Sequence, residues 1–314
     1  MTPKALRSVL VIGASGFVGR HAVEHLLAEN YQVRCVTRRP GKLDDLAARG
    51  CEVVRGDMSD ADSMDAALDS MDAVFVCVHT VLRQPGSTDA AADFMDIEIQ
   101  GLKNIVAACR ANDVRRLVSI TFLGVRPDSP SRWTRGRWDT EQYLLGSGLD
   151  VTIFRPGMIV GTGGRGFSAL MSQARHPVAL VLGDGKQRFQ HIAIEDLTYY
   201  MVASLEEPRT FGHAFDVGGD EVLTYNEMVD LAAGILGRPR TIKIHIPRWV
   251  ISSIAPAMER LGRLPRGSLR GFVSGLESDS TGDTSAIRHI LRRPPLGFTK
   301  AVERVISERS VASS

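Results

Sequence analysis

The sequence predicts a doubly wound α/β fold, a parallel Rossmann sheet with helices on both faces and a smaller C-terminal substrate lobe. Two observations predict it. Apolar strand-like runs alternate with amphipathic helical segments from residue 9 to residue 154, and alternating strands and helices pair in parallel through right-handed crossovers. In addition, the first apolar run ends in glycines at positions 13, 16 and 19, directly before a helical pattern.

Hydrophobic periodicity places the elements of the sheet in order. Strands are expected over residues 9–12, 32–37, 51–54, 73–78, 116–122 and 151–154. Helices are expected over residues 18–27, 43–48, 64–68, 94–110 and 132–145. These elements form a predicted Rossmann domain over residues 5–156.

Beyond Arg155-Pro156 the strict alternation fails, and Gly and Pro become frequent. We expect a second lobe over residues 157–309 that walls a substrate cleft, with segments near 189–197 and 213–218 returning to the Rossmann core. Its expected elements are a strand leading into a helix over 189–197, a strand over 213–219, helices over 225–236 and 249–261, and a strand over 241–246. The loop 161–166 and the side chains of Gln190, His191 and Asp196 are expected to face the cleft.

Composition excludes several classes of protein. The chain has 314 residues, 44% of them apolar, and a formal net charge of +2, which gives no global argument for binding nucleic acid. No apolar run is long enough to span a bilayer, and the chain enters its first strand without a signal peptide. Cytoplasmic residence follows as the expectation. The four cysteines are widely spaced and form no Cys-x-x-Cys, so we expect small buried residues and no metal site.

The three glycines have separate physical roles in the predicted turn. Gly13 allows the chain to leave the strand sharply, Gly16 allows close approach of phosphates, and Gly19 allows the helix to lie tight against the sheet. The N-terminus of the helix offers unpaired N–H groups and the positive end of its dipole. The motif therefore predicts a site for a dinucleotide pyrophosphate.

The residues after the second strand select between NAD(H) and NADP(H). An acidic residue there would bind the ribose 2′-hydroxyl, but the chain has Arg38 and Arg39, followed by Lys42. Arg38 can pair with a 2′-phosphate, so NADP(H) is favoured and NAD(H) is the alternative, as is a merely solvated basic turn. Asp57, after the third strand, can accept from the adenine amino group, cap the following helix, or do both.

The chain resembles the short-chain dehydrogenase/reductase superfamily in its atypical or extended branch. It is most similar to NmrA-like and complex I accessory-subunit-like (NDUFA9-like) proteins. The matching motifs cover nearly the whole chain and lie at residues 13–19, 37–38, 56–58, 148–156, 191–196, 216–224 and 281–284. In catalytic members of the superfamily, a Tyr-x-x-x-Lys pair supplies the proton donor and its partner, and a Ser or Thr hydroxyl positions the substrate carbonyl.

No Tyr-x-x-x-Lys occurs anywhere in the sequence. In the expected place the chain has Trp133 at the Tyr position and Arg137 at the Lys position, and Thr121 best matches the hydroxyl residue. An indole N–H is a donor that does not ionise usefully, and a guanidinium does not exchange protons. Cofactor binding survives these replacements, whereas the usual carbonyl reduction does not. Trp133 is either a stacking wall beside the nicotinamide or a core aromatic.

Together these patterns predict an NAD(P)(H)-binding protein with a nucleotide-sensing, assembly or structural role. The alternative is an NAD(P)H-dependent oxidoreductase that acts on a quinone, flavin or activated carbonyl or alkene without a Tyr proton donor. The catalytic candidates are Thr121, Trp133 and Arg137. The predicted cofactor-binding residues are Gly13, Ser15, Gly16, Phe17, Val18, Arg38, Arg39, Asp57, Met58, Val78, His79, Thr121, Arg137, Pro156 and Met158.

We expect the second lobe to bind a small molecule or a protein partner. The amphipathic segment 246–270 is rich in arginine. It either packs on the core of the protein or contacts a membrane surface or a partner.

Overall fold

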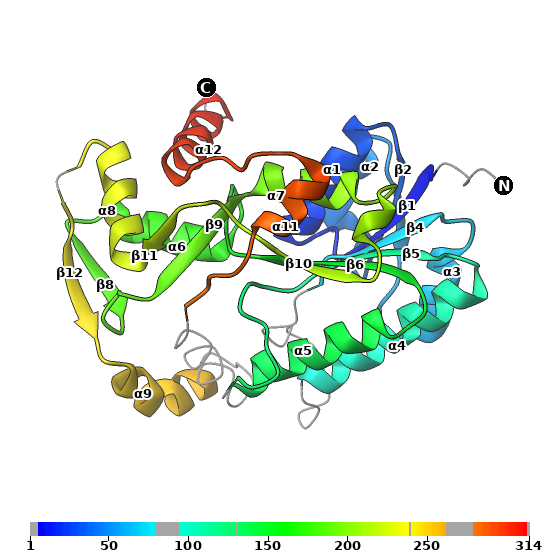
Figure 1. The fold of residues 1–314 in the computed structure, drawn as a ribbon, viewed down its shortest axis with the longest axis horizontal. Coiled ribbons are helices and arrows are strands. Elements are labelled where there is room, and N and C mark those ends of the chain that lie inside the picture. Colours follow the sequence, from blue (N-terminus) through cyan, green and yellow to red (C-terminus); the bar gives the residue numbers. More distant parts are fainter. Residues whose placement is uncertain (1–5, 79–93, 130, 239, 262–278, 313–314) are drawn as a thin grey trace.

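The computed structural model describes residues 6–78, 94–129, 131–238, 240–261 and 279–312. Its centre is a seven-stranded sheet in the order β3-β2-β1-β4-β5-β6-β10, in which all neighbours are parallel (Figure 1). The strands are β1 (Ser8–Ile12), β2 (Gln32–Thr37), β3 (Glu52–Arg55), β4 (Ala73–Val76), β5 (Arg116–Ile120), β6 (Asp150–Pro156) and β10 (His213–Val217). The predicted doubly wound parallel fold is confirmed.

Helices cover both faces of this sheet (Figure 1). One core joins the sheet to α1 (Phe17–Ala28), α2 (Asp44–Ala47), α7 (Ile194–Ala203) and α11 (Ser285–Leu291). The other joins it to α3 (Ala61–Leu68), α4 (Phe94–Ala111) and α5 (Arg132–Leu145). The expected helix over 43–48 is a 3-10 turn, Pro40–Leu43, followed by the single turn of α2, because Pro40 starts the helix early.

The order of the strands reverses between β1 and β4. The chain builds β1, β2 and β3 toward one edge of the sheet and then crosses back to add β4, β5 and β6 toward the other. Neighbouring loops diverge at such a point, so a crevice opens outside the carboxyl ends of the strands. The turn after β1 is therefore placed where a nucleotide binds in this architecture.

The later part of the chain forms two small sheets and a third core. The three-stranded sheet contains β7 (Met158–Val160), β9 (Arg188–Ala193) and β11 (Val222–Thr224), and the two-stranded parallel sheet contains β8 (Val178–Leu182) and β12 (Ile242–Ile246). Their helices are α6 (Arg165–Ala174), α8 (Tyr225–Ile235), α9 (Arg248–Leu261) and α12 (Phe298–Ala312), with a 3-10 turn at Pro208–Thr210. Among the described residues, no helix is both long and apolar enough to cross a membrane. The domain division at residues 156 and 157 stays a prediction.

A buried arginine ties the second half of the sheet together. Arg116, at the start of β5, is 3% exposed. Its guanidinium donates to the carbonyl oxygens of Asp150 (2.6 Å), Ser204 (2.8 Å) and Leu205 (3.1 Å) and to Oγ1 of Thr152 (2.8 Å). These acceptors belong to β6 and to the end of α7, so one side chain holds two strands and a helix in place.

Replacing Arg116 tests this role. An Arg116→Met substitution keeps much of the apolar stem but leaves several interior carbonyl oxygens without a donor, each worth about 1–3 kcal/mol. We expect the free energy of unfolding, measured by urea denaturation, to fall by about 3 kcal/mol or more. Arg116→Lys keeps the charge but not the fork of donors, so its loss should be intermediate. A Met variant as stable as the wild type would contradict the assignment.

Candidate functional site

The turn between β1 and α1 leaves no room for side chains at two of its glycines. Gly13 has a φ of +91°, and a Cβ there would lie 2.7 Å from the carbonyl oxygen of Cys77, which follows β4. A Cβ on Gly19 would lie 2.2 Å from the carbonyl oxygen of Gly13. Both distances are shorter than van der Waals contact, so glycine at these positions lets β1, β4 and α1 converge.

Gly16 is placed differently. It is the N-cap of α1, is exposed, and donates its N–H to the carbonyl oxygen of Gly13 at 2.9 Å. No side chain of the described residues caps α1 at Gly16. The neighbouring Ser15 is also exposed, whereas Val18 is buried in the core. The first-turn N–H groups of α1 are thus available for an anion.

Phe17 links this turn to the second lobe. Its ring lies so close to the loop after β7 that a Cβ on Gly161 or Gly164 would approach it to 2.9 and 2.8 Å. Nε2 of His21, on the next turn of α1, lies 3.3 Å from the carbonyl oxygen of Thr162. The loop 161–166 therefore packs on the first two turns of α1, beside the glycine turn.

Arg38 and Asp57 come together at the carboxyl ends of β2 and β3. Nη1 of Arg38 lies 3.5 Å from Oδ2 of Asp57, and both side chains are partly exposed. Arg39 is exposed as well, and its backbone N–H donates to Oγ1 of Thr37 at 3.2 Å. The turn presents basic side chains to solvent next to the glycine turn.

The predicted capping role of Asp57 is wrong. The N-cap of α3 is Asp60, three residues later. Oδ1 of Asp57 instead accepts from the backbone N–H of Ser59 at 3.0 Å and from its hydroxyl at 2.9 Å. This local turn delays the helix, because the carboxylate satisfies backbone donors before the first helical residue.

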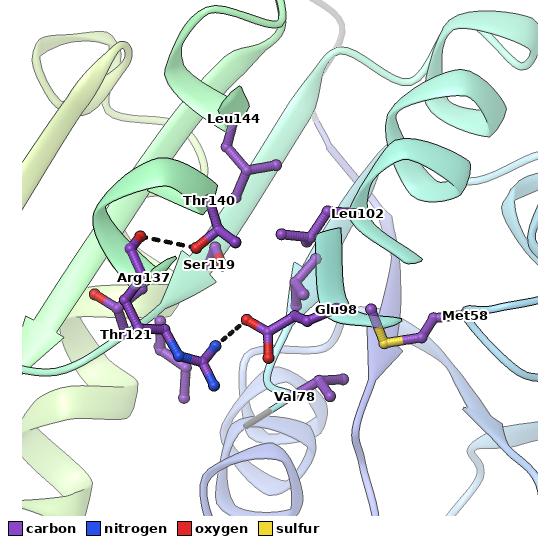
Figure 2. Close-up of a pocket in the computed structure, with 11 residues that line it drawn as sticks. Met58, Val78, Glu98, Leu102, Ser119, Thr121, Arg137, Thr140 and Leu144 are labelled. Atoms are coloured by element: carbon purple, nitrogen blue, oxygen red, sulfur yellow. Dashed lines mark hydrogen bonds and ion pairs between the residues drawn. The ribbon is translucent and has the colours of Figure 1, made fainter. Parts of the chain in front are cut away.

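A small cavity lies at the carboxyl ends of β4 and β5, and Figure 2 shows the side chains that line it. It is roughly large enough for one water molecule. Four predicted site residues meet here although they are far apart in the sequence. The lining residues are Met58, Val76, Val78, Glu98, Leu102, Ser119, Ile120, Thr121, Arg137, Thr140 and Leu144.

Arg137 forms a buried ion pair with Glu98 across this cavity (Figure 2). The Arg137 side chain is 1% exposed and that of Glu98, on α4, is 4% exposed. Within the described part of the chain, Nε and Nη2 of Arg137 have no hydrogen-bond partner. Burial lowers the pKa of Arg137, and the Glu98 carboxylate opposes that shift. The cavity thus contains a cation with N–H groups left for a further acceptor.

Thr121 belongs to a second buried charge cluster beside the first. Its hydroxyl donates to Oε1 of Glu141 at 2.5 Å. The Glu141 side chain is fully buried on α5 and also pairs with the guanidinium of Arg155, whose Nε lies 3.0 Å from Oε2. Because the Thr121 hydroxyl proton points to a carboxylate, the oxygen faces any ligand as an acceptor. It cannot at the same time donate to a substrate carbonyl.

Glu98, Glu141 and Arg155 are the site residues that sequence reasoning missed. Glu141 stands four residues after Arg137 on α5, a spacing that places two side chains on one helix face. Arg155 occurs at the end of β6, beside a motif that the sequence analysis had singled out. The four-residue spacing from Arg137 could have identified Glu141 as a site residue from the sequence. No such pattern marks Glu98, since a glutamate in an amphipathic helix is normally solvated.

Trp133, Pro156 and Met158 do not line the cavity at the ends of β4 and β5. Trp133 stacks on Phe122 with ring centroids 4.3 Å apart and an interplanar angle of 5°. Pro156 is buried at the end of β6, and Met158 pairs with His191 of β9. His79 lies outside the described residues. The assignment of these residues to a cofactor stays a prediction.

The three polar residues near β9 do not face the cleft as expected. Gln190 donates to the carbonyl oxygen of Gly219 at 3.1 Å and accepts from Gly282 N at 2.8 Å. Nε2 of His191 lies 3.1 Å from the carbonyl oxygen of Leu296. Asp196 accepts from Nε of Arg293 at 2.7 Å. All three anchor the C-terminal segment onto the molecule, because its irregular backbone needs hydrogen-bond partners inside the protein.

Metal ligation finds no support among the described side chains. No group of three or more His, Cys, Asp or Glu residues in that part of the chain could hold a metal ion. His21 and His25 share one face of α1, but the ring of His25 binds Oγ1 of Thr198 at 3.1 Å, away from the Thr162 contact of His21. The cysteines are buried, as predicted, and burial raises the pKa of Cys77 to about 12.

The chain is similar to several known proteins. A family model described as NAD(P)H-binding matches residues 13–208. A (4-alkanoyl-5-oxo-2,5-dihydrofuran-3-yl)methyl phosphate reductase of Streptomyces griseus is 31% identical over 280 residues, 89% of each chain. Subunit 9 of the NADH dehydrogenase alpha subcomplex of Arabidopsis thaliana is 25% identical, over 76% of this chain and 60% of that protein.

Two further relatives extend the comparison. A photosystem II assembly factor of Cyanophora paradoxa is 32% identical over 47% of this chain and 44% of its own length, so the chain spans less than half of that protein. The NADPH complex of a quinone oxidoreductase from Escherichia coli has the same fold, with a TM-score of 0.73, 18% identity and coverage of 95% of this chain and 99% of that one.

Alanine substitutions test the packing of the glycine turn. In Gly19→Ala the new methyl would lie 2.2 Å from a backbone oxygen, so α1 must shift. We expect the free energy of unfolding to fall by about 2 kcal/mol, the typical effect of overpacking. Gly166→Ala, in α6, is the control, because nothing lies within 4 Å of its Cβ position. Equal stability of the two variants in urea denaturation would show that the turn is not close-packed.

Proposed function

The chain belongs to the NAD(P)H-binding family, and we propose that it binds NADPH in preference to NADH without carrying out tyrosine-dependent carbonyl reduction. The bound nucleotide then serves sensing of the nucleotide pool, assembly with a partner, or stability of the fold. A cytoplasmic location is part of this proposal. Each part of the nucleotide has a matching feature in the structure.

The pyrophosphate fits the turn between β1 and α1. Ser15 and Gly16 are exposed at the start of the helix, and the first-turn N–H groups point out of the sheet. A side chain at position 16 would occupy the space above the turn, whereas glycine lets phosphate oxygens approach the backbone. The family match begins at Gly13, at the same turn.

The adenosine end fits the turn after β2. Arg38 is half exposed and faces the carboxylate of Asp57 at 3.5 Å, a distance that is long for a charge-assisted hydrogen bond. A 2′-phosphate, with its greater charge and three oxygens, would compete well for this guanidinium. An acidic residue, which would favour the free 2′-hydroxyl of NADH, is absent at positions 38 and 39.

We place the nicotinamide ribose at the ends of β4 and β5, where the cavity has room for about one water molecule and must widen to admit the sugar. Nε and Nη2 of Arg137 have no hydrogen-bond partner among the described residues, and the hydroxyl oxygen of Thr121 can accept from a donor. A ribose diol offers both kinds of group. NADPH supplies a hydride when bound, but the chain must supply the proton if a carbonyl is to be reduced.

The observation that carries the proposal is the buried Arg137–Glu98 pair where a proton donor is required. A guanidinium keeps its proton, and the Thr121 hydroxyl is committed to Glu141. None of the five tyrosines lines the cavity. Tyr200, for example, donates to the carbonyl oxygen of Arg293, and burial raises its pKa to about 12. Among the described residues, the site therefore offers groups that can hold the nucleotide but no tyrosine or histidine to protonate an alkoxide.

The second candidate is an NAD(P)H-dependent oxidoreductase. The specific observation in its favour is the 31% identity to a (4-alkanoyl-5-oxo-2,5-dihydrofuran-3-yl)methyl phosphate reductase over 89% of both chains. Its substrate would be a quinone, flavin or activated carbonyl or alkene, because such acceptors take a hydride and obtain their proton from water. This candidate uses the same nucleotide site.

Substitution of Arg38 tests the nucleotide preference. In Arg38→Asp, the charge that pairs with the 2′-phosphate is reversed, so the Kd for NADPH should rise by about tenfold or more while the Kd for NADH changes little. Calorimetric titration measures both. Arg49→Asp is the matched control, because Arg49 is also half exposed and pairs with Glu24 elsewhere on the domain. An unchanged ratio of the two Kd values in Arg38→Asp would refute the NADPH preference.

Turnover distinguishes the two candidate functions. Purified protein with NADPH is followed by absorbance against quinones, aldehydes and enones. We expect NADPH consumption no faster than without protein, because no tyrosine or histidine among the described residues lines the cavity to act as a general acid. Multiple turnovers that Thr121→Val abolishes and Arg49→Asp retains would overturn the binding-only function and establish the second candidate. Failure to bind either nucleotide would overturn both.

A further inference from the structure

The two-stranded sheet of β8 and β12 exposes a row of aliphatic side chains. The strands are parallel, with Ile242 opposite Val178 and Ile244 opposite Leu180. The exposed fractions of these four side-chain positions are 67%, 40%, 51% and 54% in that order. Ala179 and Val181, between them on β8, are buried in the third core. Parallel strands normally have both faces covered, so an open aliphatic face on such a pair is unusual.

The orientation of β12 is fixed by a charge on its inner side. Nζ of Lys243 binds Oδ1 of Asp230, on α8, at 2.5 Å, and the Lys243 side chain is only 9% exposed. Successive strand residues point to opposite faces, so this pair holds Ile242 and Ile244 outward. A shift by one residue would bury them but break the pair. The open face is thus built into the fold.

A tryptophan close to β12 in the sequence is also exposed. Trp249 lies in the first turn of α9, which follows β12 directly (Figure 1), and it is 70% exposed. Ile254, one turn further on, is 43% exposed. Tryptophan is the side chain that prefers the boundary between lipid headgroups and acyl chains. We define the outer face as Val178, Leu180, Ile242, Ile244 and Trp249.

The charges at the end of the outer face where β8 and β12 begin are basic, whereas Asp184 follows β8 at the other end. Arg175 and His176 precede β8, and Arg238 and Arg240 precede β12; all four are exposed and, since the strands are parallel, lie at the same end. Arg240 also lies 3.4 Å from Asp230, which it shares with Lys243. Residues 171–182 and 231–258 contain no aspartate or glutamate. An aliphatic surface with a basic border is complementary to an anionic lipid surface.

We propose that the outer face docks the protein onto the surface of a membrane that contains anionic lipids. The aliphatic row and Trp249 enter the headgroup region, and the basic residues before β8 and β12 contact lipid phosphates. A second copy of the chain is a poorer occupant, because the basic borders would meet no carboxylates in its outer face. The proposal is independent of what the nucleotide does.

Vesicle binding tests this proposal. Full-length protein is mixed with vesicles of phosphatidylcholine alone or with phosphatidylglycerol added, and bound protein is measured by sedimentation and by the Trp249 contribution to fluorescence. We expect binding, with a blue shift, only when phosphatidylglycerol is present. The double variant Ile242→Thr/Ile244→Thr should lower the partition coefficient about tenfold or more. Val222→Thr/Leu231→Thr is the control, because these side chains are 46% and 39% exposed on β11 and α8.

Each other outcome contradicts the proposal. No binding to anionic vesicles overturns it, as does an equal loss in the control variant. A concentration-dependent dimer in light scattering, abolished by the outer-face variant, would assign the face to a second copy instead. NADPH titration of the outer-face variant should match the wild type. It shows that the variant is folded and separates this proposal from the nucleotide site.

Discussion

Two buried carboxylates, Glu98 and Glu141, form the ion pairs that join neighbouring elements at the ends of β4 and β5. Their side chains are 4% and 0% exposed. A carboxylate removed from water is tolerated only with a partner of opposite charge, and loss of such a partner typically costs about 3–5 kcal/mol. Arg137 and Arg155 fill that role, so α4, α5 and β6 are held together by charge at the carboxyl ends of β4 and β5.

The glycine turn and the alternation of strands and helices could be predicted because they follow from local rules. The spacing of apolar residues predicts which segments are strands and which are helices. Glycine is required at positions 13 and 19 because α1, β1 and β4 approach one another so closely there that a Cβ would clash. The meeting of Met58, Val78, Thr121 and Arg137 in one cavity also followed, since carboxyl ends of parallel strands share an edge of the sheet.

Long-range pairing could not be predicted in the same way. Glu98 is separated from Arg137 by 39 residues, and nothing in its own helix distinguishes a buried glutamate from a solvated one. Asp57 favours a cap by type, but Asp60 begins the helix because the Asp57 carboxylate is taken by Ser59. β8 has a local signal, an unbroken apolar run over Val178–Leu182, but its pairing with β12, some sixty residues later, has none. The roles of Gln190 and His191 likewise depend on the C-terminal segment that covers them.

In the proposed function, the glycine turn holds the pyrophosphate of NADPH, and the nicotinamide half lies at Thr121 and Arg137, which buried carboxylates hold in place. The most direct measurement compares the Kd of NADPH with that of 2′,5′-ADP, which lacks the nicotinamide half, in the wild type and in Thr121→Val. The account predicts tighter binding of NADPH in the wild type and a loss in Thr121→Val confined to NADPH. Equal affinities in the wild type, or an equal loss for both ligands, would contradict it.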